Sequence, residues 1–320
     1  MNNIRIAAAQ FENVNGDKVY NLAKIRELTA EAVAQGAEVV SFHECCIPAY
    51  SFVQNLSKAQ LLELAEPVPD GDSIQQLMDI SSEFKVPILA GLIERDGETL
   101  YNTYVCVDGH KFVAKFRKLH AFINPHVASG NEFCLFELRG WKCGILICYD
   151  NNIIENVRMT TLLGADIIFM PHVTGCLPSV MPGRGVVDPP LWANREVDPV
   201  ALRMELDGPK GRGWLMHWLP ARAYDNGIYA VFTNPIGMDN GEVRNGNAMI
   251  LDPYGEVISE CRNLGDDVCV GTCTPEKIAS SSGRRYIRAR RTELYSKLTA
   301  ATGEPPITAP GWELQSPDDA

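Results

Sequence analysis

A strand–helix–strand alternation near the N-terminus constrains the fold of this chain more than any other feature. The apolar run Ile4–Ala9 predicts a strand, and the run Ala37–Phe42 predicts another. Between them, segment 18–35 carries Leu, Ile and Ala side chains three to four residues apart, which is typical of an amphipathic helix that ends at Gly36. Two strands joined through one helix form a βαβ unit with parallel strands, so we expect an α/β fold.

The same order of elements returns around Cys148. The run Gly144–Ile147 predicts a buried strand, a helical pattern follows it, and Ala165–Met170 predicts the next strand. Cys148 lies where the strand gives way to a turn, at the sheet edge where open α/β folds place their chemistry. The competing interpretation is a structural thiol, because free cysteine is among the most buried residue types.

Two other titratable residues also follow predicted strands. Glu44 comes directly after the strand at 37–42, where a carboxylate serves either as a loop or capping charge or as a general base. Lys118 follows the strand at 111–116. A lysine there is usually solvated, but it acts in catalysis when burial changes its pKa or a cysteine lies beside it.

The remaining pattern predicts one domain over 1–302 with mixed sheets. Segment 174–214 is rich in Gly and Pro and is expected to be a long excursion with one helix at 199–206, while 303–320 is expected to be an extended tail. Further helices are predicted at 57–64, 74–84, 218–226 and 287–300, and further strands at 86–93, 101–107, 229–234, 247–251, 256–261 and 268–272.

Composition excludes several classes of protein. The 320 residues are 46% hydrophobic, and a net charge of -11 without basic blocks argues against nucleic acid or an anionic membrane as a partner. No apolar run has transmembrane length, and the first residues lack the basic and apolar segments of a signal peptide. Ten cysteines without a CxxC pair predict a reducing cytoplasm rather than disulfides or zinc.

Several stretches together resemble the nitrilase superfamily of carbon–nitrogen hydrolases. They are HECCIPAY around Glu44, FRKLH around Lys118, CYDNNIIENVR from Cys148, GADIIFMP, RAYDNGIYAVFTNPIG and GNAMILDPYGEV. The resemblance extends from Ile4 to about Tyr295 and implies a four-layer αββα sandwich. It also implies a homodimer or higher homo-oligomer that needs no metal and no cofactor.

The resemblance also implies a role for each of the three strand-end residues. Cys148 would be the nucleophile that forms a thioester, and Glu44 the general base. Lys118 and the backbone N–H of Tyr149 would form the oxyanion hole. A thiol with an ordinary pKa of ~8.5 needs such a base or cation at neutral pH. We therefore expect a Cys148 of low pKa that is alkylated before the other cysteines.

The substrate-contact residues are less determined by the sequence. The candidates are Tyr50, Asn124, His172 and Arg195. Many family members carry a second glutamate after the lysine motif, where this chain has Asn124 and, farther on, Glu132. Arginines of the 174–214 excursion would suit a substrate carboxylate, although a solvated or oligomer-contact loop explains them equally well.

The resemblance leaves three functions open. Cys148-Tyr149-Asp150 is similar to the amidase and N-carbamoyl-amine hydrolase branches, which predicts cleavage of a small amide or N-carbamoyl compound with release of ammonia. A nitrilase that converts a nitrile to an acid is the alternative within the family. An inactive nitrilase-fold binding subunit is the alternative outside enzymes. A metal site at His43, Cys45, Cys46, His120 and His126 lacks any ligand spacing.

Overall fold

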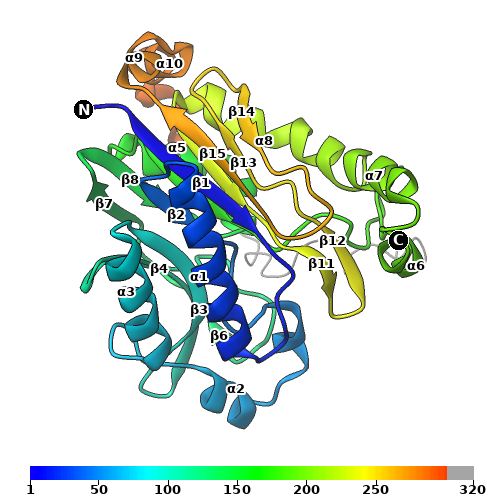
Figure 1. The fold of residues 1–320 in the computed structure, drawn as a ribbon. Helices are drawn as coiled ribbons and strands as arrows, with labels where there is room; N and C mark the ends of the chain where they lie inside the picture. The colour runs from blue at the N-terminus through cyan, green and yellow to red at the C-terminus, as the bar shows by residue number, and fades with distance from the viewer. Residues whose placement is uncertain (301–320) are drawn as a thin grey trace.

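The computed structural model describes residues 1–300, and two sheets stacked face to face form its centre (Figure 1). Helices cover the outer face of each sheet, so the layers follow the order helix, sheet, sheet, helix. This confirms the predicted four-layer αββα sandwich with mixed sheets. The predicted tail at 303–320 lies outside the described residues.

The first sheet has the strand order β15-β1-β2-β3-β4-β5, with β6 beside β4. Its strands β1, β2 and β3 are parallel, which confirms the N-terminal βαβ unit, and β15 pairs antiparallel with β1. The bounds are β1 (Ile4–Gln10), β2 (Val39–Ser41), β3 (Ile88–Asp96), β4 (Thr99–Asp108), β5 (Lys111–Arg117), β6 (Val127–Ala128) and β15 (Asp267–Cys273).

The second sheet has the order β14-β13-β10-β9-β8-β7 and again has three parallel strands at its centre, β8, β9 and β10. The bounds are β7 (Cys134–Leu138), β8 (Trp141–Ile145), β9 (Ile167–Pro171), β10 (Tyr229–Thr233), β13 (Met249–Leu251) and β14 (Val257–Glu260). A separate hairpin pairs β11 (Ile236–Asp239) with β12 (Glu242–Asn245).

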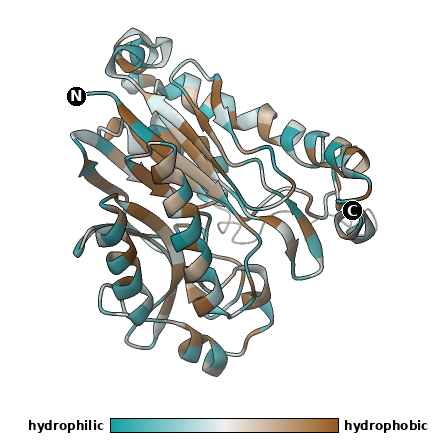
Figure 2. Ribbon diagram, in the orientation of Figure 1, coloured by the Kyte–Doolittle hydropathy of each residue, from teal (hydrophilic) through white to brown (hydrophobic). Residues whose placement is uncertain are grey.

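Alternation along β1 shows how the layers are held together. Ile6 and Ala8 join the apolar core shared with the second sheet, whereas Ala7 and Ala9 join the core beneath α1 (Lys18–Ala34) and α3 (Asp72–Phe84). Because successive side chains of a strand point to opposite faces, a strand buried on both faces is apolar throughout. Figure 2 shows the resulting hydrophobic colour along the central strands.

The outer layer of the second sheet consists of α5 (Ile154–Leu162) and α8 (Arg212–Asn226), and α10 (Ser282–Arg288) packs against α8. The other helices are α2 (Lys58–Leu64), α4 (Tyr149–Asn152), α6 (Pro189–Ala193), α7 (Pro199–Asp207) and α9 (Pro275–Ser280), with 3-10 turns η1 (Ser51–Asn55), η2 (Thr292–Leu294) and η3 (Ser296–Leu298). Among residues 1–300, no helix combines the length and apolar character needed to cross a membrane.

The predicted helix at 287–300 is wrong. The chain is helical earlier, in α9 and α10, and then forms only the short turns η2 and η3. Leu294 and Leu298 are 63% and 64% exposed, so this segment buries no apolar face. A short helix without tertiary packing is unstable in water. The excursion 174–214 contains α6 in addition to the predicted helix, and α8 begins at Arg212 instead of residue 218.

Candidate active site

The three strand-end residues meet where the two sheets face each other. Glu44 follows β2 and Lys118 follows β5, both in the first sheet, whereas Cys148 follows β8 in the second sheet. The Sγ atom of Cys148 lies 3.9 Å from the carbonyl oxygen of Val173, and the N–H of Val173 donates to Glu44 Oε2 at 3.1 Å. Val173 follows β9, so each sheet contributes two residues to the site.

Glu44 and Lys118 form an ion pair with no solvent exposure of either side chain. Lys118 Nζ lies 2.7 Å from Glu44 Oε1, and it also lies 3.4 Å from the hydroxyl of Tyr50. Burial by itself lowers the pKa of Lys118, but the nearby acidic groups, Glu44 first among them, together outweigh burial, so the pKa lies well above its ordinary value. The ammonium group is therefore charged at neutral pH, and its charge faces the thiol.

Cys148 occupies a backbone conformation that side chains rarely adopt. Its φ is 51° and its ψ is -112°, and it stands as the N-cap of α4. The strand ladder still holds it, because its N–H donates to the carbonyl of Pro171 at 2.8 Å. The bend turns the thiol from the strand direction toward Glu44 and Lys118, in the manner of a nucleophile elbow.

The thiol of Cys148 does not have the expected low pKa. Burial and the charge of Glu44 raise its pKa to about 12, against a smaller lowering by Lys118. The resting group is therefore a neutral thiol at pH 7, which differs from the expected low pKa, whereas the order in which the cysteines are alkylated stays a prediction. A neutral thiol needs a base to take its proton during attack, and the Glu44 carboxylate faces it.

Polar side chains hold the bend around Cys148. The buried Asp150 accepts hydrogen bonds from the backbone N–H groups of Leu119 and His120, and from His120 Nδ1 at 2.7 Å. Arg222 of α8 donates to the carbonyls of Asn151 and Asn152 at 2.9 and 2.7 Å. These contacts attach the turn after Cys148 to the loop after Lys118 and to the outer helix layer.

Comparison with known proteins identifies the family of this chain. The family model "Carbon-nitrogen hydrolase" matches residues 5–282. The chain belongs to this family.

Curated relatives of this carbon–nitrogen hydrolase have several activities. A nitrilase from Pyrococcus abyssi is 30% identical over 253 residues, with 78% of this chain and 82% of the relative covered. An (R)-stereoselective amidase from Pseudomonas sp. is 28% identical and covers 80% of each chain. Among solved structures, an amidase of Nesterenkonia sp. AN1 in complex with acrylamide superposes with a TM-score of 0.67 at 21% identity, covering 92% of this chain and 97% of the amidase.

The substrate-contact candidates fall in different places of the hydrolase fold. Tyr50 joins the site through its contact with Lys118. Asn124 is buried, and its amide is engaged by backbone groups: it donates to the carbonyls of Val53 and Leu56 and accepts from the N–H of His126. The amide of Asn124 is therefore used to hold this loop.

His172 is buried behind the turn that follows Cys148. Its Nε2 lies 3.1 Å from Asn151 Nδ2, and its ring packs against Trp218 and Phe232. Burial lowers the pKa of His172 well below its ordinary value, with a further contribution from Lys118, so the imidazole is neutral. Because Asn151 also contacts the carbonyl of Cys148, His172 touches the site through this asparagine.

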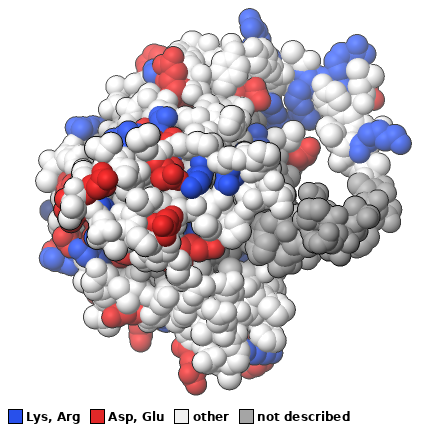
Figure 3. All heavy atoms as spheres, turned by 90° about the vertical axis from the view of Figure 1, so that its right-hand side faces the viewer, with Lys and Arg blue, Asp and Glu red and all other residues white. Residues whose placement is uncertain are grey.

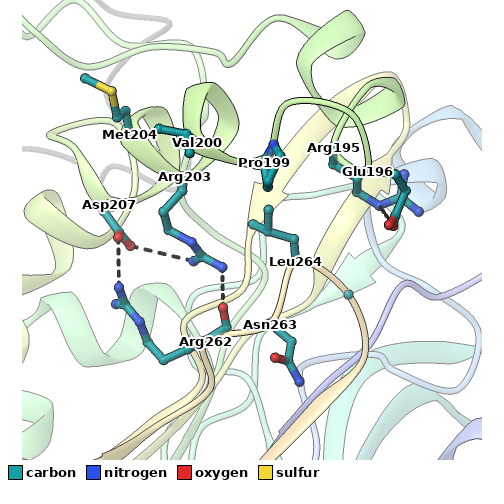
Figure 4. Close-up of a pocket in the computed structure, with 11 residues that line it drawn as sticks. Arg195, Glu196, Pro199, Val200, Arg203, Met204, Asp207, Arg262, Asn263 and Leu264 are labelled. Carbon is teal, nitrogen blue, oxygen red and sulfur yellow. Dashed lines mark hydrogen bonds and ion pairs between the residues drawn. The ribbon is translucent and has the colours of Figure 1, made fainter.

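Arg195 lies in a surface groove of about 790 Å³ lined by α7 and the turn between β14 and β15 (Figure 4). It packs over the ring of Trp192 and lies 4.0 Å from Glu196. Elsewhere in the groove, Asp207 pairs with Arg203 and Arg262. Among residues 1–300, none of the three predicted catalytic residues lines this groove.

The sequence did not reveal two residues of the site. Asn102 of β4 donates to Glu44 Oε1 at 2.6 Å, and Val173 contributes only backbone atoms. The one available signal for Asn102 was a polar side chain within the apolar strand pattern of YNTYVCV.

Glu132, the glutamate that follows the lysine motif at a greater distance, is exposed. Within residues 1–300, His, Cys, Asp and Glu side chains form no group of three suited to a metal ion.

Proposed function

We propose that this carbon–nitrogen hydrolase cleaves a small amide or N-carbamoyl compound through a thioester on Cys148. The observation that carries the proposal is the buried Glu44–Lys118 pair, 2.7 Å apart, with the Cys148 thiol facing it. A buried charge pair beside a thiol supplies both a proton acceptor and a cation for a developing oxyanion.

The proposed reaction assigns each proton. Glu44 takes the thiol proton as Cys148 Sγ attacks the substrate carbon, and Lys118 Nζ with the N–H of Tyr149 stabilises the resulting oxyanion. The tetrahedral intermediate collapses when Glu44 returns the proton to the leaving nitrogen, which departs as ammonia or an amine. Glu44 then takes a proton from water, which attacks the thioester, releases the acid and restores the thiol.

The position of Tyr149 supports its share in the oxyanion hole. It is the first residue of α4, and the first N–H groups of a helix have no intrahelical partner. The donor therefore lies next to the nucleophile in the chain, and Lys118 approaches from the other sheet.

The curated relatives favour an amide-type substrate. Besides the amidase, a citrullinase of Francisella tularensis and an N-carbamoylputrescine amidase of Solanum lycopersicum match 93% and 95% of this chain, each at 24% identity. A solved amidase carries the acetamide moiety of fluoroacetamide covalently bound at its active-site cysteine. Nitrile hydrolysis remains the second candidate, because the 30% identical relative is a nitrilase.

An ammonia-release screen tests the proposal. Primary amides, N-carbamoyl compounds and nitriles are incubated with the protein, and acid quenching followed by mass spectrometry detects the acyl group on Cys148. We expect release from amides or N-carbamoyl compounds and an adduct on Cys148 alone. Release from nitriles only would favour the nitrilase alternative, and no release from any class would favour an inactive binding subunit.

We further propose a small-molecule substrate, a cytoplasmic setting and a homodimer or higher oligomer. The ten cysteines are free thiols, which suits a reducing compartment. On the face shown in Figure 3, acidic and basic side chains are scattered among uncharged ones, with basic side chains gathered at the upper right. The net charge of -11 does not favour nucleic acid as a partner. The outward side of α5 exposes Ile154, Met159 and Leu162 by 56%, 41% and 40%, which favours self-association.

A further inference from the structure

A third side chain reaches the same oxygen of Glu44 that Lys118 binds. Asn102 lies in β4 and is 1% exposed, and its Nδ2 donates to Glu44 Oε1 at 2.6 Å. Lys118 Nζ lies 2.7 Å from this oxygen. Glu44 Oε1 is therefore occupied by two donors, one of them charged.

The orientation of the Asn102 amide follows from its neighbours. The Cys45 thiol donates to Asn102 Oδ1 at 3.3 Å, and the other side of the amide faces a carboxylate, which only accepts. The amide nitrogen must therefore point at Glu44. The backbone carbonyl of Asn102 also accepts from the N–H of Lys118 at 2.9 Å, so this residue holds both members of the ion pair.

The second oxygen of Glu44 has a different environment. Oε2 accepts one backbone hydrogen bond, from Val173 N at 3.1 Å. The carbonyl of the same Val173 lies 3.9 Å from Cys148 Sγ, so Oε2 is turned toward the nucleophile. A carboxylate oxygen with a single donor keeps a lone pair for a proton, whereas Oε1 has two donors in place.

We infer that Asn102 is a positioning residue that reserves Glu44 Oε1 for anchoring and leaves Oε2 as the oxygen that exchanges protons with the thiol and with water. This inference rests on the proposed base role of Glu44. Asn102 also stabilises the ionised carboxylate, because each hydrogen bond to a charged group favours its charged form. Removal of the Asn102 amide therefore changes both the orientation of the Glu44 carboxylate and the ease with which this carboxylate is protonated.

Two variants test the inference, Asn102→Ala and Asn102→Asp. We expect Asn102→Ala to lower kcat about 10- to 100-fold with KM within about threefold, because a misplaced base loses part of its general-base contribution. The acid limb of the pH profile of kcat/KM should move up by about one pH unit. In Asn102→Asp a second carboxylate beside Glu44 should move this limb further, since two neighbouring carboxylates resist joint ionisation.

Matched control variants distinguish a positioning role of Asn102 from a general effect on the stability of the fold. Asn21 is a buried amide of α1 that donates to the carbonyls of Val14 and Ile47, so Asn21→Ala should lower stability and leave the acid limb in place. Cys45→Ser keeps a donor to Asn102 Oδ1 and should retain the wild-type limb. An unmoved acid limb in both Asn102 variants would overturn the inference, and Asn102 would be structural.

A second readout works without turnover. The rate of Cys148 alkylation by iodoacetamide, followed by mass spectrometry across pH, also depends on a nearby proton acceptor. Its acid limb should shift in Asn102→Ala by the same amount as that of kcat/KM. If wild-type protein releases no ammonia from any substrate, the proposed function fails, and the alkylation profile still decides the positioning role of Asn102.

Discussion

The backbone conformation of Cys148 directs its side chain into the site. Its φ of 51° costs energy in any L-residue, and its thiol is buried in the apolar core, 3.9 Å from the carbonyl of Val173 and facing Glu44. We therefore expect Cys148→Ala to lower kcat by at least about 10³-fold with an unchanged circular dichroism spectrum. Cys134→Ala, at a half-buried edge-strand thiol, is the control. Wild-type turnover by Cys148→Ala would contradict its proposed role as nucleophile.

The buried Glu44–Lys118 pair couples activity to stability at the residue scale. Glu44→Gln and Lys118→Met each leave a buried charge without its partner, which costs roughly 3–5 kcal/mol, and each should lower kcat by about 10²–10⁴. The double variant removes both charges, so its free energy of unfolding should recover while its activity stays low. Urea unfolding and ammonia release measure the two effects, and a double variant as unstable as the sum of the singles would contradict this coupling.

Candidate site residues could be predicted from the sequence where a reactive side chain comes at the end of a predicted strand. Glu44, Lys118 and Cys148 each come just after a predicted strand, and the ends of parallel strands meet at one edge of a sheet. Val173 could not be predicted, because it acts through backbone N–H and C=O groups that every residue carries. The raised pKa of Cys148 also could not be predicted, because it depends on burial between two sheets far apart in sequence.

At the scale of elements, the turn after Cys148 depends on Asp150. This buried carboxylate accepts from two N–H groups of the loop after Lys118, so it aligns elements of different sheets. We expect Asp150→Asn to lower kcat about 10-fold or more, because the amide replaces one acceptor oxygen by a donor that faces donors. Asp207→Asn in the surface groove is the control. Equal kinetics in both variants would show that Asp150 does not align the site.

The excursion at 174–214 does not bring Arg195 to the predicted catalytic residues. Because Arg195 packs over Trp192 and lies beside Glu196 in the groove of Figure 4, away from the predicted catalytic residues, we expect Arg195→Ala to change KM less than about twofold for both carboxylated and neutral substrates. A selective rise of KM for carboxylated substrates, by tenfold or more, would restore Arg195 as a substrate contact. Steady-state kinetics with one acidic and one neutral amide decides between the two outcomes.

At the scale of the whole molecule, burial of the thiols links stability to pH. Burial raises the pKa of nine of the ten cysteines, among them Cys46 to about 12 and Cys134 to about 11. In the unfolded chain these thiols have a pKa of ~8.5 and lose protons that the folded chain still holds. The unfolded state therefore binds fewer protons above this pH, and stability falls as pH rises.

The expected size of this effect is large. Each deeply buried thiol loses on the order of 1 kcal/mol of stabilisation between pH 8.5 and 9.5, so the free energy of unfolding should fall by several kcal/mol from pH 7.5 to pH 9.5. Urea titrations in the presence of a reductant measure it. A flat profile across this range would mean that the thiols ionise in the folded chain as they do in the unfolded one.

The α/β class could be predicted from the residues because both parallel sheet centres consist of apolar strands, and such strands need a cover on each face, whereas the four-layer order was expected from the family resemblance. The edges were harder to predict. The hairpin β11–β12 and the strand β7 were not expected, and the helix at 287–300 was expected wrongly, because apolar spacing cannot show whether a segment finds a partner to pack against. Leu294 and Leu298 keep helical spacing and remain exposed.

The division of the site between two sheets has a mechanical consequence. The Glu44–Lys118 pair follows strands of one sheet, and the Cys148 thiol and the Val173 peptide follow strands of the other, so the proposed turnover would depend on the alignment of the two sheets. A slip of about 1 Å between them would cost about a hundredfold in rate, yet both sheets would keep every strand. Moderate pressure or a low denaturant concentration would then abolish activity while the circular dichroism spectrum still shows an intact fold.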